Sequence, residues 1–337
     1  MTHLHTVPLS ILDLAPVVEG GNATDAFKNT RDLAQHAERW GYQRYWLAEH
    51  HNMQGIASAA TSVLIGYVAE GTSTIRVGSG GIMLPNHAPL MIAEQFGTLA
   101  SMYPRRIDLG LGRAPGSDQA TARALRRGLN SNNGQDFPEL LGELRSFLNP
   151  SIEEGVPAVR AFPGEGLDIP IWLLGSSGFS AQLAGQLGLP FAFASHFAPD
   201  YLMQALHLYR SSFRPSAALE QPHVMIGVNI LAADTDEEAR FLASSQEQQF
   251  LNLIRGQTSK LKPPVANMDE LWNEQEKVVV RSKFSFGVAG SKETVRSRMA
   301  DIIEKTGADE LMITGSAYDH QARLRSFELI AEIMNEG

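Results

Sequence analysis

The sequence predicts a closed (β/α)8 barrel, an α/β fold of the TIM-barrel class. Short apolar or β-branched runs alternate with helix-length amphipathic segments almost from the first residue to the last. Eight such units can be counted, and no shift in composition marks a linker between domains. A length of 337 residues suits one barrel with insertions. We therefore expect a single domain over residues 1–337.

Each expected strand is an apolar run that a helical pattern follows. The strands are expected at residues 9–15, 42–49, 75–84, 106–112, 169–175, 190–195, 223–232 and 310–315. Start signals mark several helices. Thr24 is expected to be the N-cap of the first helix, Pro89 to lie in the first turn of the helix over 89–102, and Pro199 to precede a later helix.

Two stretches are too long to be simple connections, residues 115–168 and 257–289. The first contains a helical pattern of its own, "DFPELLGELRSFL". The second mixes Pro, Lys and apolar residues, and we expect it to be partly mobile. Both are therefore expected to be insertions in the barrel.

The composition excludes several classes of function. A net charge of -9, with no block of like charge, argues against nucleic acid and anionic membranes as partners. The absence of cysteine excludes disulfides, thiolate nucleophiles and cysteine metal sites. There is no secretion signal and no apolar run of 18 residues, so a cytoplasmic protein is expected.

Polar residues follow the second expected strand without a break, in "YWLAEHHN". The active site of such a barrel lies at the carboxyl ends of its strands, which places Glu49, His50, His51 and Asn52 at the site. The simpler alternative is a hydrogen-bonded pair of histidines that only holds a loop in place. The combination of an acid, two histidines and an amide favours a functional site.

The third strand carries glycines where a strand normally avoids them. Gly78, Gly80 and Gly81 lie within "VGSGGIMLP". Glycine in a strand often marks the close approach of a ligand or of another backbone, and a β-bulge is the alternative.

The fourth strand ends in "GLGRAPGSD", which superficially resembles a dinucleotide-binding fingerprint. Ala114 and Pro115 interrupt the pattern, and no later acidic ribose ligand completes it, so we reject that interpretation. Arg113 remains as a cation at a strand end, suited to a phosphate or an anionic ring.

The fifth strand runs into a helix through "GSSGFS". Backbone N–H groups, hydroxyls and a helix N-terminus converge there, which predicts a phosphate-binding loop. An ordinary helix cap is the alternative, and "TGSAYDH" after the eighth strand is a rival phosphate site with fewer donors. The residues of the predicted loop are Gly175, Ser176, Ser177, Gly178 and Ser180.

The remaining histidines do not predict a metal site. His3 and His5 precede the first strand and so lie at the wrong end of the barrel, and His50 and His51 are adjacent rather than at ligand spacing. His196, after the sixth strand, is expected to be structural when it is considered alone.

Taken together, these residues resemble the bacterial luciferase-like family of flavin-dependent monooxygenases, and the small single-chain members most closely. The resemblance is densest over residues 45–118, in the order "AEHH", "VGSGGIMLP" and "AEQFGTLASMYPRRIDLGLGR". One departure is Gly112, which stands where light-emitting members carry a cysteine. A luciferase reaction is therefore not expected.

The resemblance implies roles for individual residues. His50 matches the catalytic histidine beside the flavin, and Glu49 matches its acidic neighbour. Gly80 and Gly81 match a pair joined by a non-proline cis peptide against the flavin ring. Arg113 matches an arginine near the flavin phosphate, and "GSSGFS" matches the phosphate loop.

The implied activity is that of an FMN-dependent monooxygenase. Reduced FMN would react with oxygen to a C4a-hydroperoxide that oxygenates a small aldehyde, ketone or amine. The barrel uses nearly the whole chain and leaves no nicotinamide-binding domain, so a separate flavin reductase is expected to supply reduced FMN. An F420-dependent hydride-transfer dehydrogenase and a non-catalytic flavin-binding protein are the alternatives.

The segment after "EHHN", "IASAATSVLIGYVAEG", is rich in small residues and apolar around much of its circumference. A helix with one face in water would not need this. We expect a homodimer through this helix and the helix over 89–102, in line with the resemblance. The alternative is that the small residues only pack against strands.

Overall fold

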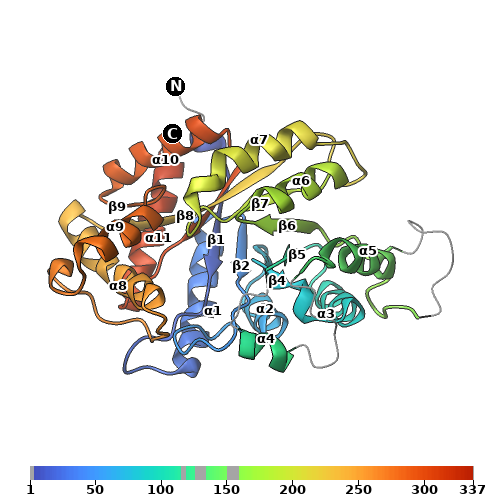
Figure 1. Cartoon of the computed structure of the whole chain (residues 1–337), viewed down its shortest axis with the longest axis horizontal. Helices are drawn as coiled ribbons and strands as arrows, with labels where there is room; N and C mark the ends of the chain where they lie inside the picture. Colours follow the sequence, from blue (N-terminus) through green and yellow to red (C-terminus); the bar gives the residue numbers. More distant parts are fainter. Residues whose placement is uncertain (1–3, 115–118, 126–133, 150–158, 337) are drawn as a thin grey trace.

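The expected barrel is confirmed in the computed structural model, which describes residues 4–114, 119–125, 134–149 and 159–336 (Figure 1). Parallel strands follow one another in the order β10-β1-β2-β3-β5-β6-β7-β8, and pairing of β10 with β8 closes the ring. Every expected strand range contains one of them. The strands are β1 (Leu9–Asp13), β2 (Arg44–Leu47), β3 (Arg76–Ser79), β5 (Ile107–Gly112), β6 (Ile171–Gly175), β7 (Phe191–Phe193), β8 (Val224–Ala232) and β10 (Glu310–Thr314).

Two short strands extend the barrel at its carboxyl end. The third expected strand is interrupted at Gly80 and Gly81, and its second part forms β4 (Ile82–Met83), which pairs with β5. In the second insertion, β9 (Val288–Gly290) pairs with the end of β8. The mouth of the barrel is therefore deeper on these two sides.

Helices cover the outside of the barrel, and the two ends of the chain lie near each other, where η1 (Leu4–Thr6) contacts the last helix (Figure 1). The helices are α1 (Ala23–Trp40), α2 (Thr61–Glu70), α3 (Pro89–Met102), α4 (Gln119–Leu125), α5 (Phe137–Leu148), α6 (Gly178–Leu187), α7 (Leu202–Ser212), α8 (Asp236–Ile254), α9 (Glu274–Lys283), α10 (Lys292–Thr306) and α11 (His320–Asn335). Within the described ranges, no helix is long and apolar enough to span a membrane.

The helix starts are partly as predicted. Pro89 lies in the first turn of α3, as expected. Thr24 is not the N-cap of α1. Asn22 is, because its side-chain oxygen accepts hydrogen bonds from the N–H groups of Thr24 (2.8 Å) and Asp25 (3.2 Å). After Pro199 the chain forms a 3-10 turn before α7 begins.

The two insertions have structure of their own. α5 confirms the helix predicted in the first insertion. In the second, Leu261 is completely buried and is hydrogen-bonded to the loop after β1. Its N–H donates to the Val17 carbonyl (2.9 Å), and its carbonyl accepts from the Glu19 N–H (2.8 Å). This ties the insertion across the carboxyl end of β1.

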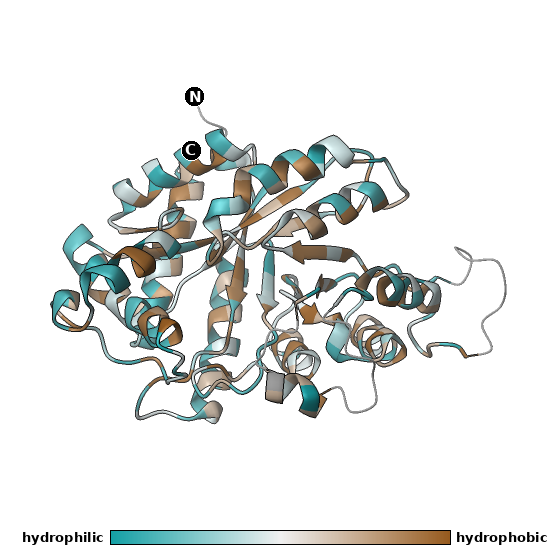
Figure 2. Cartoon of the chain, viewed as in Figure 1, coloured by the Kyte–Doolittle hydropathy of each residue, from teal (hydrophilic) through white to brown (hydrophobic). Residues whose placement is uncertain are grey.

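The main core lies between strands and helices, and alternate strand residues point into it. Figure 2 shows hydrophobic strands enclosed by helices with mixed faces. On β1, Ile11 packs outward, whereas Leu12 points inward. The inward cluster includes Trp46 and Trp172, whose rings meet edge to face at 5.3 Å between centroids.

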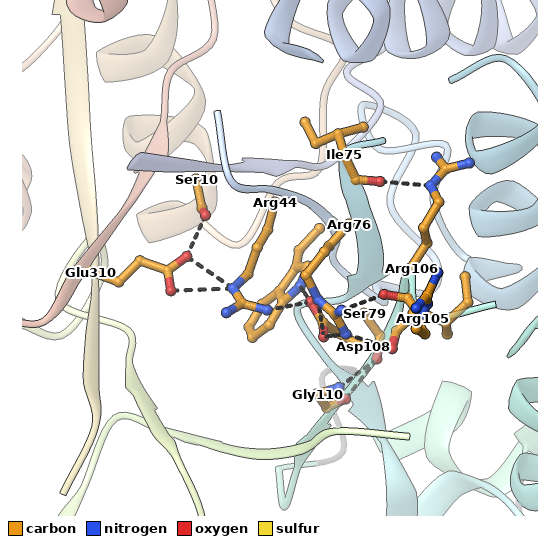
Figure 3. A network of polar contacts seen from close by, with 12 residues as sticks. Ser10, Arg44, Ile75, Arg76, Ser79, Arg105, Arg106, Asp108, Gly110 and Glu310 are labelled. Atoms are coloured by element: carbon orange, nitrogen blue, oxygen red, sulfur yellow. Dashed lines mark hydrogen bonds and ion pairs between the residues drawn. The ribbon is translucent and has the colours of Figure 1, made fainter. Parts of the chain in front are cut away.

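Charged side chains close the amino end of the barrel (Figure 3). Arg44 lies between two carboxylates: its Nη1 donates to Asp108 (2.8 Å) and its Nε to Glu310 (3.1 Å). Asp108 also accepts from Nε of Arg76 (2.9 Å) and from the Trp46 indole (3.1 Å). These residues stand at the starts of their strands, so the network seals the end opposite the mouth.

Candidate active site

Glu49 lies just past the end of β2 and is 1% exposed. Its carboxylate accepts hydrogen bonds from Nε2 of His51 (2.7 Å), from Nε2 of His87 (3.0 Å) and from the Met83 N–H (2.9 Å). An ionised carboxylate has only acceptors, so both imidazoles carry a proton on Nε2. Glu49 therefore gathers three donors from three segments of the mouth.

These partners control the charge of Glu49. Burial alone raises its pKa, but the hydrogen bond and charge of His87, the hydrogen bond of His51 and the Met83 N–H outweigh burial. The net result is a pKa below the ordinary value for a glutamate. The side chain is therefore ionised at neutral pH.

The contacts of Glu49 also fix backbone. Met83 belongs to β4, which directly follows the glycine pair of the third strand. By holding the Met83 N–H, Glu49 ties the end of β2 to β4. His87 was missed in the sequence, although "PNHAP" between a strand and a helix start could have indicated a polar residue at the mouth.

His50 faces a different set of neighbours. Glu49 and His51 meet each other, and His50, between them in sequence, is half-buried. It interacts electrostatically with His196, which follows β7. The structure thus brings His196 to the mouth beside a predicted site residue.

The glycines of the third strand are required by close packing. A Cβ at Gly81 would lie 2.7 Å from the carbonyl oxygen of Gly110 on β5, and one at Gly80 would lie 2.5 Å from Leu12. The peptide bond between Gly80 and Gly81 is cis, as the resemblance implied. Because both residues are glycines, no side chain covers the backbone of Gly80 and Gly81 at the mouth of the barrel.

The predicted phosphate loop forms the N-terminus of α6. Ser177 is the N-cap residue, yet its side chain makes no capping hydrogen bond. Ser176 and Ser177 are half-buried, whereas Ser180 is buried and turned toward Gly175. The first N–H groups of α6 are therefore not satisfied by a side-chain cap.

Arg113 adds a positive charge to this N-terminus. Its guanidinium lies 4.4 Å from the ring centroid of Phe179, in the first turn of α6. The structure thus joins two sites that were predicted separately, the end of β5 and the loop after β6.

The rival site after β10 is less suitable for an anion. Asp319 is the N-cap of α11, and its carboxylate accepts from the Ala322 N–H (2.8 Å). A negative side chain therefore occupies that helix N-terminus already, which makes it unfavourable for an anion.

The other end of the barrel carries a cavity of about 280 Å³ lined by residues that include His5, Trp40 and Tyr42. His5 is thus at the amino end, as expected, and far along the barrel axis from the mouth. His3 lies outside the described residues. In the parts of the chain with a described structure, no three His, Asp or Glu side chains are grouped to hold a metal ion.

Comparisons with known proteins agree with this arrangement. Residues 8–310 match the family model "Luciferase-like monooxygenase". A luciferase-like monooxygenase of Escherichia coli K12 is 57% identical over 331 residues, covering 98% of both chains. The N-acetyl-S-alkylcysteine monooxygenase of Bacillus subtilis is 32% identical, covering 97% of this chain and 98% of that protein.

Solved structures share the fold. The crystal structure of apo-MsnO8 has a TM-score of 0.86 at 34% identity and covers 99% of both chains. An FMN complex of the oxygenating constituent of 3,6-diketocamphane monooxygenase from Pseudomonas putida has a TM-score of 0.72 at 19% identity, covering 98% of both chains. An F420-dependent secondary alcohol dehydrogenase has a TM-score of 0.67 at 12% identity, covering 98% of this chain and 99% of that one. At such low identity the last two show the fold alone.

Proposed function

Because the chain belongs to the family of luciferase-like monooxygenases, and is therefore an enzyme of the oxidoreductase class, we propose that it is FMN-dependent. In this proposal it uses reduced FMN and oxygen to oxygenate a small organic substrate. The observation that carries it is the uncapped N-terminus of α6 beside Arg113.

The residues present fit the phosphate of FMN. The N–H groups at the start of α6 and the hydroxyls of Ser176 and Ser177 are donors, and Arg113 supplies a positive charge. These groups would hold a phosphate dianion at the ends of β5 and β6. Gly80 and Gly81 would offer backbone without side chains to the flavin ring.

The chain's own residues have distinct tasks in this reaction. When bound, reduced FMN supplies the electrons that activate oxygen. We assign to His50 the exchange of a proton with the reacting ligand at its imidazole nitrogen, because imidazole is the side chain that most often serves as a general acid or base. Glu49 is ionised and already accepts three hydrogen bonds, so its task is to position His51, His87 and β4.

The substrate is expected to be a small aldehyde, ketone or amine. Thioethers join this panel because a relative at 32% identity is named for the oxygenation of an N-acetyl-S-alkylcysteine. The test is product analysis by mass spectrometry after addition of photoreduced FMN, air and each compound. Absence of substrate-dependent product across the panel would favour a non-catalytic flavin-binding protein.

FMN and F420 can be separated by binding. Absorbance and fluorescence titrations of the ligand-free protein with FMN, riboflavin and F420 should show the tightest binding for FMN. Tighter binding of F420, with hydride transfer to it from an alcohol, would support the dehydrogenase alternative instead.

Reduced FMN is expected to come from a separate reductase. The described residues belong to the barrel and its insertions, and they include no second α/β domain for a nicotinamide nucleotide. We expect segment 257–289, which is hydrogen-bonded to the β1 loop through Leu261, to close over the bound flavin. Rapid, saturable oxidation of NADH or NADPH by the purified protein with FMN alone would contradict the two-component arrangement.

We also propose a homodimer through α2 and α3, which contact each other. Large apolar side chains stand out from their surface: Val63 is 73% exposed, Met91 51% and Met102 55%. A second copy would bury them. Light scattering should give the mass of a dimer at micromolar concentration, and Val63→Glu should shift it toward the monomer; a wild-type monomer would contradict the proposal.

A further inference from the structure

His196 carries an unexplained feature at the mouth of the barrel. In the described part of the chain, three buried side-chain atoms make no hydrogen bond of normal geometry: His196 Nδ1, His223 Nε2 and Ser245 Oγ. The Gly227 backbone interacts with the His196 ring, but outside that geometry. Buried polar atoms of this kind are rare in folded proteins, because an unmade hydrogen bond in the interior costs about 1 to 3 kcal/mol. His196 is the one that directly follows a barrel strand at the carboxyl end.

The barrel makes room for the His196 ring. A Cβ at Gly227 of β8 would lie 2.6 Å from Nδ1 and 3.2 Å from Cε1 of His196, so only glycine fits there. This edge of the ring is turned toward β8. Nε2 lies on the other side of the ring from Nδ1, and the electrostatic interaction with His50 puts the ring among the residues of the mouth, so we infer that Nε2 is the atom that meets a ligand.

The backbone around His196 is fixed before any ligand arrives. Ser195 Oγ donates to the Gly227 carbonyl (2.6 Å), and Asn229 Nδ2 donates to the His196 carbonyl (2.5 Å). Buried Gln246 of α8 donates to Asn229 in turn (2.9 Å). Support of this kind is typical of side chains that must be held in one orientation.

The surroundings also fix its charge. Burial lowers the pKa of His196 to about 4, and the charge of His50 acts in the same direction, while the Gly227 backbone opposes them. Two neighbouring imidazolium groups would repel each other, which is why the charge of His50 favours an uncharged His196. When the surroundings give two neighbouring groups different pKa values, the two groups can take different acid–base roles.

We propose that His196 is a second functional histidine of this site, one that donates or accepts a hydrogen bond to the ligand bound in the mouth and transfers no proton. The proposal rests on the proposed function, and it adds a residue from the loop after β7 to a site otherwise built from β2 to β6. His50 and His196 then contact the reacting ligand from different strands.

Three substitutions separate this role from a structural one. His196→Phe keeps the ring shape without hydrogen bonds, His196→Gln places an amide near the position of Nε2, and His196→Asn places one near Nδ1. His196→Phe should lower kcat with reduced FMN and the best substrate of the panel by about 10- to 100-fold. His196→Gln should stay within about 3-fold of wild type, and His196→Asn should not recover.

His223→Phe is the matched control. His223 Nε2 also makes no hydrogen bond, although it lies 3.7 Å from Glu310 Oε2, and the residue precedes β8 at the amino end of the barrel. Its substitution should leave kcat, KM and the FMN dissociation constant unchanged in the folded protein. Thermal unfolding of every variant accompanies the kinetics.

The charge of His196 is read in the wild type by NMR of 13C-labelled histidine. Its ring signal should not titrate between pH 5.5 and 8 in the ligand-free protein, and it should shift when FMN is added. A titration near neutral pH, or no shift with saturating FMN, overturns the proposal. This measurement also decides the matter if His196→Phe does not fold.

The kinetic outcomes are equally decisive. Folded His196→Phe with wild-type turnover removes the role, and a His196→Gln as inactive as His50→Gln shows proton transfer instead. If the wild type binds no FMN, the proposed function fails and this assignment fails with it. If the wild type binds FMN and turns over while His196→Phe matches it, only this assignment fails.

Discussion

Glu49 shows how one buried carboxylate can organise a barrel mouth. It holds His51, His87 and the Met83 N–H at once, and these partners keep it ionised despite burial. The sequence pointed to Glu49 and His50 as a pair. The contacts instead pair Glu49 with His51, while His50 interacts electrostatically with His196.

Glu49→Gln should destabilise the fold by about 1 to 3 kcal/mol, because an amide cannot accept from all three donors. The pKa of Glu49 is lowered in the folded protein, so its contribution is complete above the unfolded-state pKa of about 4.3 and is lost as the pH falls through the lower folded-state pKa. Urea unfolding should therefore give a constant difference from wild type above about pH 5 and a smaller one below pH 4. Exposed Glu139→Gln is the control, and an equal loss in both variants would contradict this role.

His50→Ala should retain the fold and FMN binding while turnover falls by about 100-fold or more. The reason is that a positioned proton-transfer group is lost, whereas the phosphate loop and the Glu49 contacts remain. Calorimetric binding of FMN and product formation are measured on the same preparation. Unchanged turnover would remove His50 from the mechanism.

The uncapped N-terminus of α6 leads to a prediction about FMN binding. Ser177→Ala should cost little stability, because the Ser177 side chain makes no capping hydrogen bond. It should lower the affinity for FMN by about 10-fold or more, because a hydroxyl donor to the phosphate is lost. Riboflavin, which lacks the phosphate, should bind almost unchanged. Asp319→Ala on α11 is the matched control. Loss of this N-cap should lower the free energy of unfolding by about 1 kcal/mol and leave the affinity for FMN unchanged. Equal weakening of FMN and riboflavin would point to a folding defect instead.

Periodicity predicted the eight barrel strands because each is a short apolar run between turn residues, and this information is local. The interruption at Gly80 and Gly81 was visible as glycines, but β4 depends on pairing with β5. The N-cap of α1 was misjudged by two positions, since Asn22 and Thr24 are both good caps and only the backbone conformation decides between them.

The site was less predictable than the fold, because its contacts join residues far apart in the chain. Arg113 meets Phe179, and His87 meets Glu49, and no local pattern encodes either pair. His196 was expected to be structural because it was considered alone, and the room that Gly227 of β8 makes for its ring is not visible in the sequence. Contacts between residues so far apart in the sequence form only when the barrel has folded.

The whole barrel depends on the charged network at its amino end. Asp108 is completely buried and holds Arg44, Arg76 and the Trp46 indole. Asp108→Ala should leave Arg76 without a carboxylate partner and Arg44 with Glu310 alone. We expect a loss of about 3 to 5 kcal/mol in unfolding free energy, measured with urea, and unchanged FMN affinity in the folded fraction. Glu328→Gln, in an exposed pair with Arg325, should have nearly no effect. A loss for Asp108→Ala no larger than for Glu328→Gln would contradict the structural role of the network.

Oxygen incorporation in a single turnover is the most direct test of the proposed monooxygenase activity. Photoreduced FMN, the purified protein and 18O2 are mixed with each substrate of the panel, and the products are analysed by mass spectrometry. We predict one 18O atom in the product of a preferred substrate, formed without nicotinamide nucleotide, and the loss of this product in His50→Ala. Product without 18O, or hydride transfer to F420 with no oxygen consumed, would contradict this prediction.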